Sequence, residues 1–351
     1  MIAEKRWIMK RGIALLLIGL SIFLVYLFFF GGRENLANIA VTLRTADPFY
    51  YSLAFVSITL SMFFSSLSWH LLLNLLSIRA TLRKAFLYLW IGAFVDLVVP
   101  AESVSGEVSK AYLMSKNSNV NSGKVVASIV SHKILSMTVT LGGLIISSVF
   151  FVLKYKPSEL ILAVAVIVIA SCSAVSIILL AYLSLKEQTT KKLVNWVIKL
   201  AARISRGRWE LTSLRSKAQR MLKAFHGGID TLARNPRDLV WPVLLSIVSW
   251  IFNVLVVSLV FLSIGHKISS SAILVVYSIS VSLQSIPVGI PGEVGFMEFI
   301  MTALYRLLGV PIVISIVATV LTRVVTLWFK LIVGYAAVQW VGINVLVGGK
   351  H

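Results

Sequence analysis

Long apolar runs dominate this sequence and leave one class of fold open to it. The run "LAVAVIVIASCSAVSIILLAYL" at 162–183 contains no charged residue. About 20 such residues cross a bilayer as a helix, whose backbone hydrogen bonds are all satisfied internally. The chain is 58% hydrophobic and only 13% charged, far from the balance of a soluble domain. We therefore expect an all-α, polytopic integral membrane helical bundle that forms a single transmembrane domain over residues 1–351.

The apolar runs divide into spans. We predict full spans at about residues 12–30, 50–76, 125–153, 158–184, 238–264 and 311–345. The first is long and lacks a small-residue cleavage site, so we interpret it as a retained helix and not as a signal peptide. Lys5, Arg6, Lys10 and Arg11 precede it, which places the N-terminus in the cytoplasm of a multi-pass cell-membrane protein.

Two further apolar segments, 85–116 and 270–309, are each interrupted near the middle. The first interruption reads "VVPAESVSGEVSKAYLM" and the second "SIPVGIPGEVGFMEFIM". Each half is too short to cross the bilayer, so we predict two re-entrant broken-helix hairpins. Non-helical backbone at membrane depth must be buried in protein or line a water-filled cavity. The hinge and backbone residues would be Pro100, Gly106, Pro287, Pro291, Gly292 and Gly295.

The prolines and glycines predict where each half-helix ends and begins. Pro100 and Pro287 would stop the entering halves, and Gly106 would permit a tight turn. The departing halves would begin near Gly106 and Pro291, with their N-termini inside the membrane. Free N–H groups and the helix dipole make such a terminus attractive to anions.

Residues 186–237 form a basic insert, with thirteen Lys or Arg against three acidic residues. Apolar positions recur at helical spacing, which predicts a cytoplasmic amphipathic helix on the inner leaflet; a solvated connector is the alternative. The formal net charge of +20 then reflects cytoplasmic loops near anionic lipid, and we expect no nucleic-acid partner.

The two interruptions also predict an internal repeat. Repeat 1 would cover about 50–155 and repeat 2 about 238–345, each in the order full span, broken span, full span. Ser68-Trp69 matches Ser249-Trp250, and "VASIVSH" matches "VATVLTR". The charge distribution opens the first hairpin inward and the second outward, an inverted arrangement common in transporters.

Charged residues gather near the interruptions. Ionisable groups at membrane depth are costly and usually functional. Two simpler roles remain open: the glutamates could cap their own helices, and Arg323 could form a structural ion pair with Glu293 or Glu298. The candidate substrate-binding residues are Glu102, Glu107, Lys110, His132, Lys133, Glu293, Glu298, Arg306 and Arg323. Acids on two hairpins beside bases on two spans suit a phosphate-bearing headgroup.

Four segments resemble a known family: "VDLVVPAESVSGEVSKAYLMSK", "ASIVSHKILSM", "IPVGIPGEVGFMEFIMTALYRLLGVP" and "ATVLTRVVTLW". They are similar to the membrane region of lysylphosphatidylglycerol synthases and to related single-domain, flippase-like proteins, especially archaeal ones. The resemblance implies that Glu107, Lys110, His132, Lys133, Glu293, Glu298 and Arg323 line a lipid path.

The sequence departs from the family pattern at four positions. Lys110 and Lys133 stand where arginine is usual, Ser136 replaces a common aspartate, and Glu293 stands where glycine is usual. The soluble aminoacyl-transfer domain of the synthases is missing, so the resemblance implies headgroup translocation and no lysyl transfer.

We therefore predict translocation of a polar, anionic or phosphate-linked lipid, such as an anionic phospholipid or a polyprenyl-phosphate-linked lipid. Glu107 and Glu293 would gate the path or exchange protons, and Arg323→Ala would abolish transport without unfolding the chain. One alternative is a non-transporting partner or scaffold for a lipid-modifying or glycosyl-transferring enzyme; another is a membrane enzyme with a glutamate base. The chain lacks the motifs of an ATP-driven pump or a zinc protease, so we expect no enzymatic activity, no cofactor and no metal.

Overall fold

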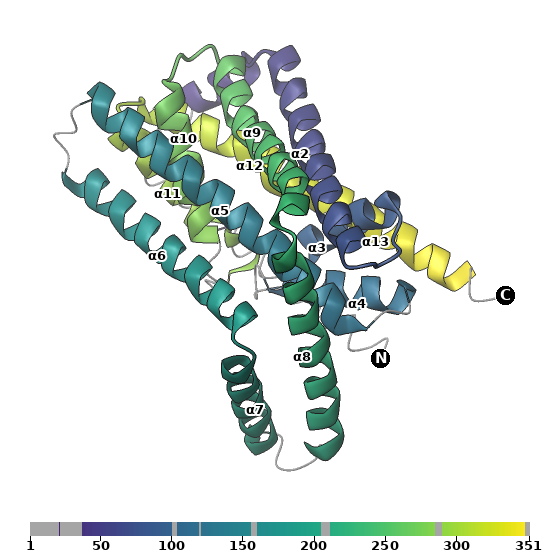
Figure 1. The fold of residues 1–351 in the computed structure, drawn as a ribbon. Coiled ribbons are helices and arrows are strands. Elements are labelled where there is room, and N and C mark those ends of the chain that lie inside the picture. The colour runs from purple at the N-terminus through teal and green to yellow at the C-terminus, as the bar shows by residue number, and fades with distance from the viewer. Residues whose placement is uncertain are drawn as a thin grey trace.

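The computed structural model of this chain describes residue 21 and the ranges 37–99, 104–118, 121–155, 160–204, 211–284 and 290–347. Every regular element in these ranges is helical, as predicted (Figure 1). The predicted span at 12–30, Pro100, Glu102 and Pro287 lie outside the described residues, apart from Ser21.

The helices follow the predicted order. They are α2 (Pro48–Leu75), α3 (Leu82–Val98), α4 (Ser105–Ser118), α5 (Ser122–Tyr155), α6 (Leu160–Leu185), α7 (Glu187–Ile204), α8 (Leu211–Arg234), α9 (Val240–Ser263), α10 (Ser270–Gln284), α11 (Phe296–Leu307), α12 (Ile312–Arg323) and α13 (Lys330–Val347). Short turns η1 (Pro236–Leu239) and η2 (Pro291–Glu293) precede α9 and α11.

Four helical stretches of the described chain are long and apolar enough to cross a membrane. They cover Pro48–Leu75, Ser122–Val149, Pro236–Ser263 and Ile312–Gly342. A fifth candidate joins the end of α6 to α7, but the two are bent by 99° where α7 begins. The chain is therefore a multi-pass membrane protein, in which α6 ends its span at this bend.

Helices α2 and α9 form the central pair and run in opposite directions. Ser57 Oγ donates to the Phe252 carbonyl oxygen at 2.8 Å, and Ser68 Oγ donates to the Pro242 carbonyl oxygen at 2.8 Å. Between them, the hydroxyls of Ser61 and Ser249 lie 3.1 Å apart. Small hydroxyl residues let two membrane helices approach closely and hydrogen-bond across the interface. These hydrogen bonds explain why serines recur in two otherwise apolar spans.

Both interrupted segments fold as two separate helices, as predicted. Helices α3 and α4 lie near the C-terminal end of α13, whereas α10 and α11 lie at the opposite end of the bundle (Figure 1). Their tips meet inside the bundle, where Leu97, Val294 and Leu327 form a small buried cluster. An inverted repeat requires two such segments that enter the bundle from opposite ends. The repeat itself stays a prediction.

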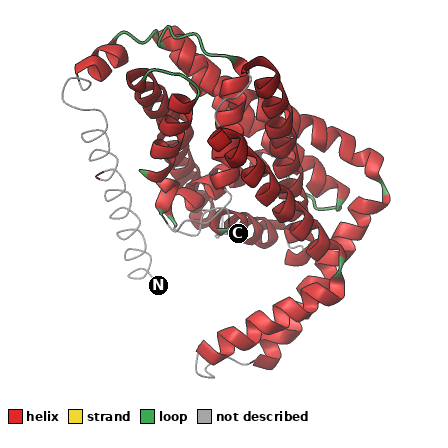
Figure 2. Ribbon diagram, turned by 90° about the vertical axis from the view of Figure 1, so that its left-hand side faces the viewer, coloured by secondary structure: helices red, strands yellow, loops and turns green. Residues whose placement is uncertain are grey.

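The basic insert forms two helices, where the sequence predicted one. Helices α7 and α8 lie side by side and project from one end of the bundle (Figures 1 and 2). Ile229 and Leu232 of α8 are buried in the core, whereas Leu193 and Trp196 of α7 are 43% and 60% exposed. The amphipathic pattern is thus satisfied by packing along α8 and leaves apolar residues of α7 uncovered. Binding to the inner leaflet stays a prediction.

The predicted span at 311–345 contains a change of helix type. Helix α12 ends at Arg323, the π-helical segment η3 (Val324–Phe329) follows, and α13 continues to Val347. A π-helical turn widens the helix and re-aims the side chains around it, and such turns are frequent at functional sites. The widened segment directly follows Arg323, one of the predicted substrate-binding residues.

Candidate functional site

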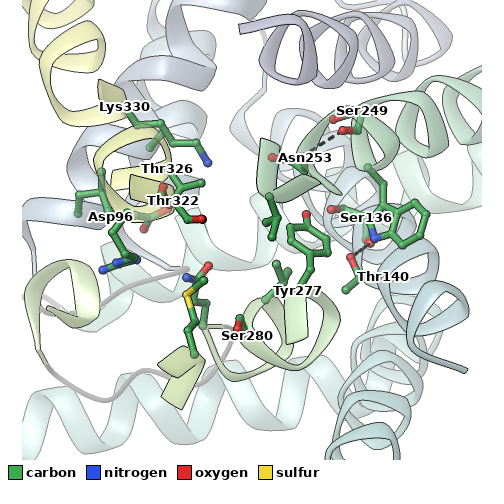
Figure 3. A pocket seen from close by; sticks show the side chains of 18 of the residues that line it. Asp96, Ser136, Thr140, Ser249, Asn253, Tyr277, Ser280, Thr322, Thr326 and Lys330 are labelled. Carbon is green, nitrogen blue, oxygen red and sulfur yellow. Dashed lines mark hydrogen bonds between the residues drawn. The ribbon is translucent and has the colours of Figure 1, made fainter. Parts of the chain in front are cut away.

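A polar cavity of about 310 Å³ lies where the two interrupted segments meet the long spans. It is lined from α3, α5, α9, α10, α11, α12, η3 and α13, so it is enclosed by both halves of the chain (Figure 3). The polar lining residues that Figure 3 labels are Asp96, Ser136, Thr140, Ser249, Asn253, Tyr277, Ser280, Thr322, Thr326 and Lys330. A convergent set of polar groups within an apolar bundle defines a candidate binding site.

The cavity has two cationic residues in its wall, Arg323 and Lys330. Figure 3 shows the Lys330 side chain extending past Thr326 and Thr322 toward the open space. A membrane-embedded cation is costly unless a counter-charge or hydrogen-bond acceptor is close. Asp96 adds one carboxylate to the same wall, which therefore holds two cations against one anion and suits an anionic group beside Lys330.

Three polar atoms of the cavity residues have no hydrogen-bond partner within the described chain. They are Trp250 Nε1, Ser280 Oγ and Thr322 Oγ1, all of them buried. A buried polar group without a partner costs free energy. These three groups favour an occupant that offers hydrogen-bond donors and acceptors.

Asp96 connects the cavity to the first interrupted segment. Its Oδ1 accepts hydrogen bonds from Ser105 Oγ at 2.9 Å and from the Gly106 N–H at 2.7 Å. The carboxylate of α3 thus caps the N-terminus of α4. A Cβ at Gly106 would overlap both Asp96 and the Gly92 carbonyl oxygen. Gly106 is needed for this close approach, and it lies inside α4 rather than in the predicted turn.

Glu107 does not cap its own helix but lies between two lysines. Its Oε2 is 2.5 Å from Lys110 Nζ, and its Oε1 is 3.9 Å from Lys133 Nζ. Lys110 is buried, with its ammonium 5.7 Å from the centre of the Trp69 ring. His132 Nε2 lies 3.4 Å from Ser65 Oγ, which makes it a packed histidine beside this cluster. One carboxylate therefore faces two ammonium groups.

Arg323 forms the structural ion pair that the sequence left open, and its partner is Glu298. Arg323 Nε donates to Glu298 Oε1 at 2.7 Å, and Arg323 Nη2 donates to the Gly292 carbonyl oxygen. The other carboxylate oxygen, Oε2, accepts from the Gly295 N–H at 2.7 Å and so caps α11. Both side chains are almost fully buried. The arginine thus fixes the second interruption while one side of it lines the cavity.

The second departing helix begins later than predicted. Helix α11 starts at Phe296 and not near Pro291, because Gly292, Glu293 and Gly295 have φ of 59°, 49° and 88°. These left-handed conformations cannot continue a helix, and they are strained for a residue with a side chain. Glu293 is fully buried in this loop, and neither carboxylate oxygen has a hydrogen-bond partner in the described chain.

The predicted residues fall into separate groups. Glu107, Lys110, His132 and Lys133 gather between α4 and α5, and Glu293, Glu298 and Arg323 gather at the second interruption. Arg306 is exposed in the last turn of α11 and does not line the cavity. Among the predicted residues that the structure describes, the cavity wall includes Arg323 alone.

Sequence reasoning missed most of the cavity wall. Ser246, Ser249 and Asn253 recur at spacings of a helical turn along α9, and Thr322, Thr326 and Lys330 do the same across η3. Such a polar stripe on an otherwise apolar span marks the face turned away from lipid. Searching the spans for hydroxyl and amide stripes, and not only for charges, would have found it.

The family follows from comparison with known sequences. Residues 16–334 match the family described as the lysylphosphatidylglycerol synthase TM region, and the chain belongs to this family. A UPF0104 membrane protein of Methanothermobacter thermautotrophicus is 25% identical over 335 residues, covering 95% of this chain and 97% of that one. A UPF0104 membrane protein of Pyrococcus horikoshii is 23% identical over 327 residues, covering 91% and 94%.

A third relative, from Methanocaldococcus jannaschii, is 24% identical over 306 residues, covering 86% of this chain and 88% of that one. Their names describe membrane proteins and state no activity. No solved structure has a significant match to the chain.

Proposed function

We propose that this protein translocates a polar, anionic or phosphate-linked lipid across the cell membrane, with its N-terminus in the cytoplasm. One observation carries the proposal: a polar cavity with Lys330 and Arg323 in its wall lies inside the bundle, where the tips of two interrupted segments meet. A charged headgroup cannot cross hydrocarbon unaided, and this cavity offers it cations and hydrogen-bonding groups at that point.

The arrangement of the two interrupted segments supports movement between the two sides. Helices α3 and α4 approach the cavity from one end of the bundle, and α10 and α11 approach it from the other (Figure 1). Many transporters place the substrate between two such segments and expose it to each side in turn. Each segment would then serve as the gate on its own side.

Glu293 suits a role in coupling. It is buried without a hydrogen-bond partner in the described chain, one residue from the carbonyl group that Arg323 holds. An ionised carboxylate in that position is costly, so the residue would exchange a proton during transport. Glu107, held by two lysines, would gate the opposite side.

The test is lipid movement by the purified protein in liposomes. Labelled anionic phospholipid, polyprenyl-phosphate lipid and zwitterionic phospholipid are each placed in one leaflet, and a membrane-impermeant quencher reports their appearance in the other. We expect faster movement of the phosphate-linked or anionic lipids than of the zwitterionic one. No movement of any lipid, with or without a proton or sodium gradient, would contradict the proposal.

The exposed face of the α7–α8 hairpin favours a second candidate function. Leu193, Trp196 and Met221 are exposed on helices that project from the bundle. A membrane-bound lipid-modifying or glycosyl-transferring enzyme could dock there, with the bundle as a non-transporting scaffold. This candidate predicts that an enzyme co-purifies with the wild type but not with a Trp196→Ser variant, and that the bundle alone moves no lipid.

A further inference from the structure

A second, larger cavity lies beside the polar one. It has a volume of about 570 Å³ and is formed by α4, α5, α6 and α10. Its wall is mostly apolar and includes Val104, Ile129, Met137, Val168 and Leu283. The volume falls within the roughly 300–1,000 Å³ of ordinary ligand sites. An occupant of this space must itself be largely hydrocarbon.

A small space of about 80 Å³ lies between the two cavities and shares lining residues with both. It shares Ser136, Thr140 and Val281 with the polar cavity, and it shares Lys133, Ser173 and Ser282 with the apolar one. We call this small space the neck; it is lined by four hydroxyl residues, Lys133, Met137 and Val281. The order is therefore apolar cavity, neck with one lysine, and polar cavity with two cations and Asp96. An amphiphile has the same order of parts.

Lys133 stands at the junction of the neck and the apolar cavity. Its ammonium is 3.9 Å from Glu107, beyond hydrogen-bond distance, while Lys110 holds the same carboxylate at 2.5 Å. One carboxylate thus serves two ammonium groups. Lys110 is the buried partner, and Lys133 keeps 28% of its side chain exposed. Its charge is available to an anion that arrives from the apolar cavity.

We propose that the apolar cavity holds the hydrocarbon chain of a phosphate-bearing lipid, whose phosphate binds Lys133 at the neck before the headgroup enters the polar cavity. The inference rests on the proposed function, because that function makes the ligand a lipid. It adds the lateral entry route, between α4 and α6, and the residue that selects for phosphate. Charge complementarity at Lys133 and continuity with the polar cavity favour this occupant over an apolar peptide helix.

Photo-crosslinking tests the route directly. The full chain is reconstituted in zwitterionic nanodiscs that contain a trace of anionic phospholipid with a diazirine at the chain end. A neutral diacylglycerol with the same chain and diazirine is the parallel probe. Adducts are mapped by mass spectrometry of the peptides around Met137 and Cys172, both of which line the apolar cavity. We expect several-fold more adduct at these positions from the phospholipid than from the diacylglycerol.

Two variants block the path, and one controls for the added bulk. Ser173→Trp and Ser282→Trp each place an indole at a residue shared by the neck and the apolar cavity. Val175→Trp places it on the same helix as Ser173, at a position that is 63% exposed. We expect about a tenfold loss of adduct in both blocking variants, with no loss in the control. Lys133→Ala should abolish the preference for the phospholipid, and Lys133→Arg should keep it.

The outcomes separate this inference from the proposed function. Equal adduct from both probes, unchanged by Ser173→Trp and Ser282→Trp, would overturn the lipid route. If lipid moves in liposomes at the wild-type rate in both blocking variants, the route is wrong while translocation stands. If the adducts behave as expected but the wild type moves no lipid, the site is a lipid-binding site and translocation fails.

Discussion

The two interrupted segments differ in how the N-terminus of their second helix is capped and in what their carboxylates bind. In the first, Asp96 of the entering helix α3 caps the departing helix α4, and Glu107 stays free to face two lysines beside an apolar cavity. In the second, Glu298 caps its own helix α11, and the same carboxylate holds Arg323 in a nearly dry ion pair. The acidic residues look alike in the sequence, but among the described residues of the two segments Glu107 is the one that lies beside two ammonium groups.

This difference suggests that one segment has a structural ion pair and that the other binds the ligand. A buried ion pair in which both partners also hydrogen-bond to the backbone is a structural element, because removing one partner leaves an uncompensated charge. A partly exposed cluster with one cation in excess can exchange partners with an incoming anion at little structural cost. We infer that the Glu298–Arg323 pair anchors the start of α11, and that ligand binds first beside the first segment.

The largest expected change in stability tests the Glu298–Arg323 ion pair of the second segment. Glu298→Gln removes the charge that balances Arg323 and should lower the free energy of unfolding by about 3–5 kcal/mol, the cost of an unpaired buried charge. Denaturant titration of the purified protein in detergent measures it. Arg306→Gln, at an exposed position of the same helix, is the control and should change little. A loss for Glu298→Gln no larger than the control's would contradict a structural role for the pair.

The ion pair also changes what is expected of Arg323→Ala. The sequence predicted that this variant would lose transport and stay folded. Because Arg323 is bonded to Glu298 and to the Gly292 carbonyl oxygen, we now expect the folded fraction to fall as well. The ratio of transport to folded protein is the quantity to compare with wild type.

The next effect tests how closely the first segment packs. Gly106→Ala forces a methyl group into Asp96 and the Gly92 carbonyl oxygen, and it should cost about 1–3 kcal/mol of unfolding free energy. Gly142→Ala meets nothing within 4 Å and should instead stabilise α5 slightly. Thermal unfolding of both variants under one condition gives the comparison. The same sign of change in both would show that α3 and α4 do not pack as described.

A smaller effect tests the N-cap that Asp96 of α3 provides for α4. Asp96→Ala removes the acceptor for Ser105 and the Gly106 N–H and should cost about 1 kcal/mol, as for other N-caps. Asp96→Asn keeps an acceptor oxygen and should lose less than half of that. Hydrogen exchange of the first turn of α4 localises the change. Unaltered exchange in Asp96→Ala would mean that the cap does not hold α4 to α3.

The smallest effect on stability should accompany a large effect on function. Lys133→Ala leaves Glu107 with its closer partner, Lys110, so the unfolding free energy should change by no more than about 0.5 kcal/mol. Movement of phosphate-linked lipid should fall by about tenfold, as expected for the loss of one charged contact. Parallel stability and liposome measurements check both numbers. A stability loss as large as that of Glu298→Gln would show that Lys133 is as structural as Arg323 and would contradict the proposed difference between the two segments.

Most of the fold could be predicted from apolar runs, because a helix that crosses lipid needs a long uninterrupted one. Both interrupted segments were predicted from proline, glycine and glutamate within such runs, and both fold as helix pairs. The start of α11 was wrong because nothing local shows that Glu293 adopts a left-handed conformation beside Gly292. The division of the basic insert into α7 and α8 was missed because both halves have the same amphipathic pattern.

The site was harder to predict than the fold. The Glu107–Lys110 pair is local, because residues three apart on one helix share a face, and both residues were among the predicted ones. The cavity wall depends on which face of each span turns inward, and this is set by packing between helices far apart in sequence. Lys330 and Asn253 lie in spans separated from each other by the whole second interruption, so only the assembled bundle brings them to one cavity.

Lys330 offers the most direct test of the central claim that the polar cavity receives an anionic headgroup. The measurement is the rate of labelled anionic lipid movement in liposomes for wild type, Lys330→Met and Lys330→Arg, each normalised to folded, inserted protein. We predict at least about a tenfold loss in Lys330→Met and near-wild-type movement in Lys330→Arg. Equal rates for wild type and Lys330→Met, with both folded, would show that the headgroup does not pass through this cavity.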